Sequence, residues 1–324
     1  MNRSNKYTVC VIVPNFNDLN NVNDCLGSVF SQSIPFDQVI FIDDASTDES
    51  VAFVQQVIEN RPEVLFIANT VNKGTALSIN QALKHCSCDY VLFLSANDFI
   101  SPYLVERFHA TIKEGAGFWS ALCQNVSEDG TIFSPRKTPV IVSSPSFFSP
   151  SQTIELIRIY TNWSPGTTVL YHREKVIEHG GLSAPLKGLA DWLLAIIIGV
   201  KSGVVFVPEI LGTVRLHANS YLSFTLQNEV HLQSKIENYL RDQLALMPDL
   251  KSTEVDMIVG KVAGRLELNL IFGMIRYSGS TLTRLFRIFR FGYLLLRFAL
   301  SSGFLRLIMA KYIWYMRIFN SVSH

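Results

Sequence analysis

The fold is decided by a strand-and-helix pattern that begins with Thr8-Val9-Cys10-Val11-Ile12-Val13-Pro14-Asn15. This run is apolar and rich in β-branched residues until Pro14-Asn15 ends it, which is typical of a buried strand, and Cys10 is expected in the core. Similar runs occupy residues 38–42, 64–68 and 90–94. We therefore predict four strands in the first hundred residues.

The residues between these runs have helical periodicity. Apolar side chains recur at helical spacing over residues 22–30, and Ser46-Thr47-Asp48-Glu49 has the form of a capping box in front of a second helix. A third helix is expected over residues 75–85. Strands separated by helices predict an α/β protein with a parallel, doubly wound sheet, whose ligands bind at the carboxyl ends of the strands.

The second half of the sequence is less regular. We expect strands over residues 118–123, 167–171 and 203–207, the last closed by Pro208, together with a helix over residues 191–199. Residues 134–151 are rich in Ser and Pro, so a mobile loop is expected there.

The composition excludes two classes of protein. Hydrophobic residues make up 48% of the 324-residue chain and charged residues 17%, so a large core is available and extensive disorder is not expected. The net charge is +1, which argues against a nucleic-acid-binding protein. The length suits one large α/β domain with an appendage, or two modest domains.

Charge is divided unevenly along the chain. All 27 acidic residues lie at or before Glu267, with 20 of the 28 basic residues, so residues 1–267 carry a charge of −7. Eight basic residues follow Glu267 among apolar and aromatic ones, and the longest uncharged stretch within residues 291–319 has eight residues, whereas a membrane span needs about 20. We expect basic amphipathic helices that bind an anionic membrane surface, with packing on the catalytic domain or in an oligomer as the alternative.

The cysteines and the N-terminus indicate a compartment. Five cysteines form no C-x-x-C pair, so reduced thiols in a cytosol are expected. The apolar run over residues 9–13 is too short for a signal peptide. We expect a cytoplasmic protein, peripheral on the cytosolic face of a membrane.

Four polar segments follow predicted strands. They are Pro14-Asn15-Phe16-Asn17, Asp43-Asp44-Ala45-Ser46-Thr47-Asp48, the segment from Asn72-Lys73-Gly74 to Asn80, and Ser95-Ala96-Asn97-Asp98. Each alone has a structural explanation as a turn, a loop or a helix start. Their joint order and spacing indicate a functional site.

This order resembles glycosyltransferase family 2, the inverting transferases of the GT-A fold. That family has a strand ending in P-x-[YF]-N, then D-D-x-S-x-D, N-x-G-x-x-x-x-x-N and a D-x-D-like motif. An [ED]-D motif follows about 90 residues later and matches Ala190-Asp191, and a final R-x-H matches Arg215-Leu216-His217. The resemblance covers roughly residues 8–220 and implies a GT-A-like, mostly parallel α/β domain with a nucleotide-sugar donor.

The resemblance implies a donor site at the strand ends. Asp44 would accept the imide N–H of uracil or thymine, with Asp43 beside it, while Pro14 and Phe16 would line the base and ribose. The other residues expected to bind the nucleotide are Lys73, Gly74 and Asn97.

A divalent cation is the expected cofactor. The diphosphate of the donor is strongly anionic, and Mn²⁺ or Mg²⁺ with hard oxygen ligands would neutralise it. Asp98 is the expected ligand, and Asn97 offers a carbonyl oxygen. Ser95 and Asn97 stand where many relatives have carboxylates, so weak metal binding is expected. His217 is a further candidate for contact with the diphosphate or the metal.

Asp191 is the candidate catalytic base. Inversion needs one carboxylate that deprotonates the acceptor hydroxyl while it attacks the anomeric carbon. Ala190 replaces the first acidic residue of the family's pair. The alternative is that Asp191 is the N-cap of the helix over residues 191–199, and both roles can hold together.

These inferences predict an inverting glycosyltransferase that moves a sugar from a UDP-sugar to a saccharide or lipid-linked saccharide acceptor, in cell-surface polysaccharide biosynthesis. We expect a catalytic domain over residues 1–225, with its nucleotide-binding half ending at about residue 102 and its acceptor half beginning at about 103, and a helical C-terminal region over residues 226–324. The alternative is a catalytically silent sugar-nucleotide-binding or scaffold protein of the same fold, suggested by Ser95, Asn97 and Ala190. A nucleotidyltransferase is disfavoured because Pro14-Asn15-Phe16-Asn17 replaces its Gly-rich basic loop. An oligomer is compatible with the sequence.

Overall fold

A computed structural model describes residues 7–127, 131–135, 139–160, 164, 166–216, 225 and 232–276. The chain divides into two units, Met1–Arg265 and Leu266–His324, and the fold described below is that of the first. The predicted boundary at residue 225 stays a prediction. The basic segment that follows Arg276 lies outside the described residues.

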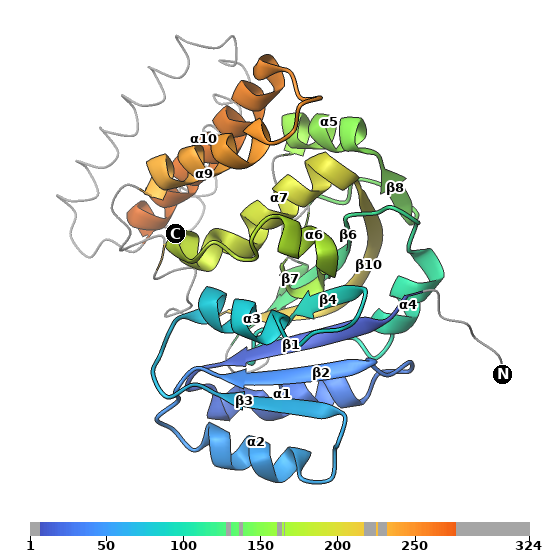
Figure 1. Cartoon of the computed structure of the whole chain (residues 1–324), viewed down its shortest axis with the longest axis vertical. Helices are drawn as coiled ribbons and strands as arrows, with labels where there is room; N and C mark the ends of the chain where they lie inside the picture. Colours follow the sequence, from blue (N-terminus) through green and yellow to red (C-terminus); the bar gives the residue numbers. More distant parts are fainter. Residues whose placement is uncertain are drawn as a thin grey trace, which may run out of the picture. The chain divides into compact units, whose positions relative to one another are not determined.

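The first hundred residues form the predicted alternation of strands and helices (Figure 1). Its elements are β1 (Val9–Asn15), α1 (Leu19–Phe30), β2 (Gln38–Asp43), α2 (Ser50–Ile58), β3 (Val64–Ala68), α3 (Thr75–Leu83) and β4 (Tyr90–Phe93). The apolar runs of β1, β2 and β4 are buried in a sheet that helices cover on both faces, whereas β3 lies at the edge of the sheet and is partly exposed.

The following segment contributes strands and helices in a less regular order. They are β5 (Phe99–Ile100), α4 (Leu104–Thr111), β6 (Phe118–Val126), β7 (Ile132–Pro135), β8 (Ser146–Phe148), α5 (Pro150–Tyr160), η1 (Gly166–Thr168), β9 (Leu170–His172), α6 (Arg173–Glu178), η2 (Ala184–Leu189), α7 (Ala190–Ser202), β10 (Val204–Arg215), α9 (Leu232–Ala245) and α10 (Ser252–Arg276).

The described strands form one ten-stranded sheet with the order β3-β2-β1-β4-β9-β6-β10-β5, and β7 and β8 pair with β6 and β10. Of these described strands, β1, β2, β3, β4, β6 and β10 run in one direction, so the sheet is mostly parallel as predicted. The chain order reverses between β1 and β4, because β2 and β3 lie on one side of β1 and β4 on the other. Such a switch point opens a crevice at the carboxyl ends of the two strands.

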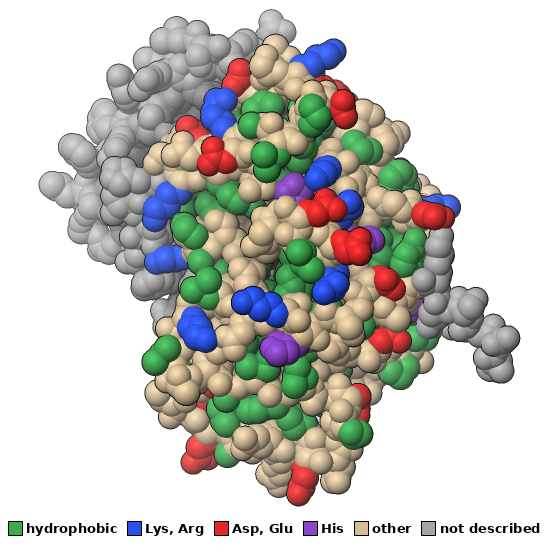
Figure 2. Space-filling view, in the orientation of Figure 1, with side chains coloured by type: hydrophobic (Ala, Val, Ile, Leu, Met, Phe, Trp, Pro, Cys, Tyr) green, Lys and Arg blue, Asp and Glu red, His purple; other side chains and the backbone are tan. Residues whose placement is uncertain are grey.

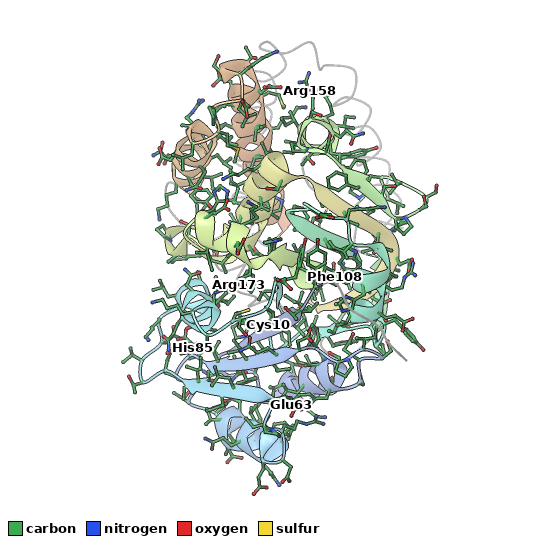
Figure 3. All side chains as sticks on the ribbon, turned by 45° about the vertical axis from the view of Figure 1, so that its right-hand side comes forward. Cys10, Glu63, His85, Phe108, Arg158 and Arg173 are labelled. Atoms are coloured by element: carbon green, nitrogen blue, oxygen red, sulfur yellow. The ribbon has the colours of Figure 1, made fainter. Side chains whose placement is uncertain are left out.

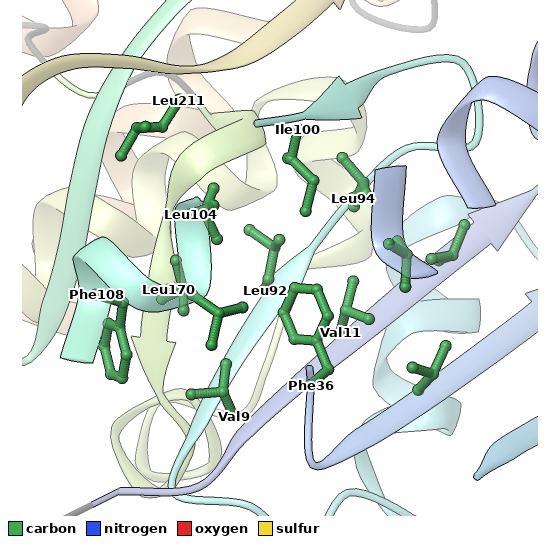
Figure 4. Close-up of a cluster of buried hydrophobic side chains, with 14 of the residues drawn as sticks. Val9, Val11, Phe36, Leu92, Leu94, Ile100, Leu104, Phe108, Leu170 and Leu211 are labelled. Atoms are coloured by element: carbon green, nitrogen blue, oxygen red, sulfur yellow. The ribbon is translucent and has the colours of Figure 1, made fainter. Parts of the chain in front are cut away.

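Helices cover the two faces of the sheet differently. The face under α1, α2 and α4 holds a cluster of buried apolar side chains, which includes Val9, Val11, Leu92, Leu104 and Phe108 (Figure 4). Alternate strand residues point to opposite faces, so Cys10 points to the face that α3 covers (Figures 1 and 3). Cys10 is fully buried, which confirms it as a core residue.

Two predicted boundaries in the second half are wrong. Pro208 does not end its strand, because β10 continues to Arg215 through a register shift between Val207 and Ile210. A bulge tolerates proline, which has no N–H to donate to a neighbouring strand. The predicted strand over residues 167–171 is the turn η1 followed by the short strand β9, which runs antiparallel to β4 and β6.

The predicted loop over residues 134–151 contains regular structure. β8 lies within it and pairs with the start of β10, and α5 begins at Pro150. Gly203 (φ 72°) allows the close approach of β8, because a Cβ there would overlap the carbonyl oxygen of Phe148.

The surface carries mixed charge. On the face shown in Figure 2, basic and acidic side chains are interspersed among apolar and neutral ones. Among the described helices, none has the length and apolar character needed to cross a bilayer.

Candidate active site

Three neighbouring strands end side by side next to the switch point. Asn15 of β1 pairs in register with Asp43 of β2, which pairs with Ala68 of β3. The loop after β4 joins them, because the Ala96 amide donates to the Pro14 carbonyl (3.3 Å). The register therefore brings together the polar segments that follow β1, β2 and β4.

Asp43 connects the ends of β1 and β2. Its carboxylate is 1% exposed. Oδ1 accepts hydrogen bonds from Asn15 Nδ2 (2.8 Å) and Ser46 Oγ (2.6 Å), and Oδ2 accepts one from the Ser46 amide (2.9 Å). These bonds fix the turn after β2 to β1, so this carboxylate positions the two loops.

The loops after β1 and β2 also hold each other through residues with strained backbones. Asn17 (φ 56°) and Ala45 (φ 63°) both have left-handed conformations. Asn17 Oδ1 accepts from the Thr47 amide (2.8 Å), while the Asn17 amide donates to Ser46 Oγ (2.9 Å). Strain of this kind persists where the surroundings over-determine it, as at binding sites.

The predicted capping box is therefore wrong. Helix α2 begins at Ser50 with Glu49 at its N-cap. Ser46 instead uses its hydroxyl to bind Asp43, which lies buried beneath it. Sequence spacing identified the hydrogen-bonding residues but not their partners.

Asp44 organises the loop between β3 and α3. It is 3% exposed, and described residues supply four donors to its carboxylate. Oδ1 accepts from Asn69 Nδ2 (2.9 Å), the Lys73 amide (2.9 Å) and Ser78 Oγ (2.8 Å). Oδ2 accepts from the Gly74 amide (2.7 Å). An oxygen with one donor keeps a lone pair for a second, so Oδ2 has the capacity to accept a further N–H.

The other predicted nucleotide-binding residues differ in exposure. Pro14 is buried within β1, whereas Phe16 is 45% exposed. Lys73 is exposed and its ammonium group donates to Gln81 Oε1 (2.7 Å) and Asn69 Oδ1 (3.2 Å). Asn97 is half-buried in the loop after β4.

Asp98 lies in that loop and is 7% exposed. Its Oδ1 accepts a hydrogen bond from the Arg215 amide at the end of β10 (3.0 Å), and its Oδ2 accepts one from Thr167 Oγ1 of η1 (2.7 Å). The carboxylate is thus held between two segments of the second half of the chain. Among the described residues, no group of three His, Cys, Asp or Glu side chains is arranged to hold a metal ion.

Asp191 lies in the first turn of α7 and is half-buried. The helix begins at Ala190 with Leu189 as its N-cap, so the alternative that Asp191 is the N-cap is wrong. Asp191 Oδ1 accepts a hydrogen bond from the Trp192 amide (2.8 Å), and Oδ2 lies against Gly166, where a Cβ would overlap it. A carboxylate in the first turn is favoured by the helix dipole.

The buried ring of Tyr171 supports the backbone of Asp191. Its hydroxyl donates to the Asp191 carbonyl (2.9 Å). Burial, with a smaller contribution from the Asp191 charge, raises the pKa of Tyr171 well above its usual value. The hydroxyl therefore stays protonated and remains a donor at neutral pH.

The family model of glycosyl transferase family 2 matches residues 10–179, slightly more than half of the chain and most of the site described above. The chain belongs to glycosyl transferase family 2.

Relatives of this family 2 chain include a bacterial glucosyltransferase and a bacterial polysaccharide synthase. The poly(ribitol-phosphate) beta-glucosyltransferase of Bacillus spizizenii is 29% identical over 109 residues, which are 33% of this chain and 17% of that protein. The poly-beta-1,6-N-acetyl-D-glucosamine synthase of Staphylococcus epidermidis is 31% identical over 105 residues, 31% of this chain and 25% of that protein. The matched segments thus span a quarter or less of these relatives.

Solved structures resemble the chain over most of its length. TarS 1-349 of S. aureus in complex with UDP-GlcNAc has a TM-score of 0.63 at 18% identity and covers 83% of this chain and 80% of its own. The mannosyltransferase PcManGT from Pyrobaculum calidifontis in complex with GDP-Man and Mn²⁺ has a TM-score of 0.58 at 17% identity, covering 89% and 80%. This likeness confirms the predicted GT-A-like fold.

In this family 2 chain, sequence reasoning missed several residues of the site. Asn69 and Ser78 bind Asp44, and Thr167 binds Asp98. Asn69 directly follows β3, and its position at a strand end was the available signal. Thr167 was placed inside a predicted strand, so nothing in the sequence marked it. Predicted candidate His217 lies outside the described residues.

Proposed function

We propose that this chain transfers a sugar from a UDP-sugar to an acceptor hydroxyl with inversion at the anomeric carbon. The observation that carries the proposal is the arrangement of three carboxylates. Asp44 lies at the end of β2, and Asp98 after β4 and Asp191 on α7 both contact η1. These carboxylates suit contact with the nucleotide, charge neutralisation and proton removal, respectively.

The donor is proposed to bind over the ends of β1 and β2. Asp44 Oδ2 accepts the imide N–H of uracil, and the exposed ring of Phe16 covers the base and ribose beside Pro14. Asp43 acts by holding these loops. Lys73, Gly74 and Asn97 complete the donor site. Complexes of TarS with UDP and with UDP-GlcNAc support a uridine donor.

The residues fit a divalent cation through one carboxylate. Asp98 is an oxygen ligand, and the Asn97 carbonyl lies next to it in sequence. Mg²⁺ is commonly held by one or two carboxylates together with substrate phosphates, so Asp98 suffices once the donor is bound. A bound Mn²⁺ or Mg²⁺ would supply positive charge to the diphosphate leaving group. His217 is a proposed further contact.

Asp191 is the proposed general base. Its carboxylate takes the proton from the acceptor hydroxyl, whose oxygen forms a bond to the anomeric carbon. The bond between that carbon and the diphosphate oxygen breaks, and UDP leaves. Attack from the face opposite the diphosphate inverts the anomeric carbon. A base of this kind contributes about 10²–10⁴-fold to the rate.

The acceptor is proposed to be a saccharide or lipid-linked saccharide of a cell-surface polysaccharide. The activities named for the two bacterial relatives support this class. The basic, apolar segment after Glu267 would hold the protein on the anionic cytosolic face of a membrane.

A catalytically silent sugar-nucleotide-binding protein is the second candidate. Ser95, Asn97 and Ala190 favour it, because they replace acidic residues of the family's motifs. Incubation with a panel of UDP-sugars, Mn²⁺ and saccharide acceptors separates the two. If the protein transfers sugar or hydrolyses the donor, and Asp191→Asn abolishes this activity, the protein is an enzyme. Nucleotide binding without turnover would support the silent protein.

A further inference from the structure

A short segment that begins at Gly166 touches two of the carboxylates in the site. η1 and the adjoining β9 are separated by the single residue Val169. Thr167 of η1 contacts Asp98, while Gly166 and Tyr171 contact Asp191. The proposed metal ligand and the proposed base therefore share one supporting segment.

Thr167 fixes one side of Asp98. Its side chain is 6% exposed, and its hydroxyl donates to Asp98 Oδ2 over 2.7 Å. The amide of Arg215 holds Oδ1 from the other side. A carboxylate that is held at both oxygens has a defined orientation towards a cation and a diphosphate.

Gly166 and Tyr171 fix Asp191. The absence of a side chain at Gly166 leaves the space that Asp191 Oδ2 occupies. The Tyr171 hydroxyl donates a hydrogen bond to the backbone carbonyl of Asp191. A Cβ at Gly166 would meet the end of the aspartate side chain, which can rotate. The carboxylate, and not the fold, would have to move.

We propose that Gly166, Thr167 and Tyr171 are positioning residues that set the placement of the Asp191 and Asp98 carboxylates relative to each other. This inference rests on the proposed function. Its physical reason is that the base must meet the acceptor while the metal ligand holds the leaving group, and a misplacement of about 1 Å can cost about 10²-fold in rate. One short segment, which comprises η1 and β9, provides both constraints.

The first test replaces Gly166. Gly166→Ala is expected to lower kcat about 10- to 100-fold with little change in donor KM. The control is Gly117→Ala, whose Cβ would crowd Ile198 Cγ2 (2.6 Å) and Ser202 Cβ (2.8 Å) at the far end of the same helix. This control is expected to lower the melting temperature at least as much while keeping kcat.

A double-mutant cycle separates positioning from general damage. If Gly166 acts through Asp191, adding Gly166→Ala to Asp191→Asn lowers the residual rate by no more than about twofold. Tyr171→Phe is expected to lower kcat in the same way and also to have little effect in the Asp191→Asn background. An equal loss from Gly166→Ala in both backgrounds would overturn the proposal.

The second test replaces Thr167 and reads out binding. Thr167→Val is expected to weaken UDP binding about tenfold in calorimetry with Mn²⁺ and to leave it unchanged in EDTA. Thr167→Ser should restore most of the affinity because it keeps the hydroxyl. The matched control is Thr168→Val, since Thr168 is fully buried in the same turn and donates to the Ala121 carbonyl (2.6 Å). It should lower stability without changing the Mn²⁺-dependent binding.

The outcomes distinguish this inference from the proposed function. Transfer that survives in folded Asp191→Asn overturns the proposed function itself. The positioning role alone is overturned if Asp191→Asn strongly lowers the transfer rate while the other two variants behave normally. Normal behaviour here means a wild-type kcat in Gly166→Ala and wild-type Mn²⁺-dependent UDP binding in Thr167→Val. The expected results, obtained in all three variants, support both.

Discussion

Replacement of Asp44 by alanine should weaken both the fold and the nucleotide site. The carboxylate accepts bonds from two buried side chains and two loop amides, and Asp44→Ala removes this shared acceptor. Asn69 Nδ2 keeps Ser78 Oγ as an acceptor (2.9 Å), and the Gly74 amide keeps Asn72 Oδ1 (3.0 Å). The cost therefore falls mainly on the fully buried Ser78 hydroxyl and on the Lys73 amide.

The magnitude follows from the number of buried donors left unpaired. Each costs about 1–3 kcal/mol, and water can reach part of the loop, so we expect a loss of about 2–4 kcal/mol in the free energy of unfolding. For a domain of this size, that loss corresponds to a melting temperature lower by roughly 4–16 °C. UDP affinity should also fall by more than about tenfold, with Mn²⁺ and in EDTA alike, because the proposed partner of Asp44 is the base.

Scanning calorimetry and titration calorimetry measure these two effects. Asp37→Asn is a suitable control, because Asp37 Oδ2 accepts from the Val9 amide (2.8 Å) at the opposite end of β1. It should leave UDP affinity unchanged. An Asp44→Ala protein with wild-type melting temperature, or with UDP affinity lost only in the presence of Mn²⁺, would refute this reasoning.

Three further predictions concern the metal ligand, the connection between α3 and the turn after α6, and the C-terminal segment. Asp98→Ala should weaken UDP binding with Mn²⁺ and leave it unchanged in EDTA; equal losses in both titrations would contradict its role. Asn80 exchanges two hydrogen bonds with the backbone of Leu182 (both 2.8 Å), ahead of Asp191 in the chain. Asn80→Ala should therefore lower the free energy of unfolding by about 1–3 kcal/mol. An unchanged melting curve would argue against this connection. Full-length protein should sediment with anionic vesicles, and salt should release only part of it, whereas a chain ending at Arg276 should not sediment. Full-length protein left in the supernatant would exclude membrane binding.

The pattern of the first hundred residues could be predicted because it depends on local periodicity. The strands and helices there follow from apolar spacing, and the strand ends identified Asp44 and Asp98 as candidate site residues. The hydrogen-bond partners of the site carboxylates could not be predicted. Asp43 and Asp44 are adjacent, so their side chains point to opposite faces, but the sequence does not say which face meets Ser46 and which meets Ser78.

The second half was harder to predict because long-range pairing decides it. A proline such as Pro208 is typical of a strand end, yet β10 continues past Pro208 because the strand has a bulge there opposite β6. Thr167 lies 69 residues from Asp98 in sequence, and only the sheet brings the two together. Gly166 could not be predicted as a site residue for the same reason, because its role depends on the position of the Asp191 side chain.

The most direct test of the central claim compares transfer and binding in Asp191→Asn. We predict that transfer from a UDP-sugar falls by about 10²–10⁴-fold while UDP affinity stays within about threefold of wild type. Asp256→Asn is the matched control, since it makes the same chemical change at an exposed residue of α10 that pairs with Arg241 of α9, and it should keep full activity. A folded Asp191→Asn protein that transfers sugar at a rate near that of wild type would contradict the assignment of Asp191 as the base.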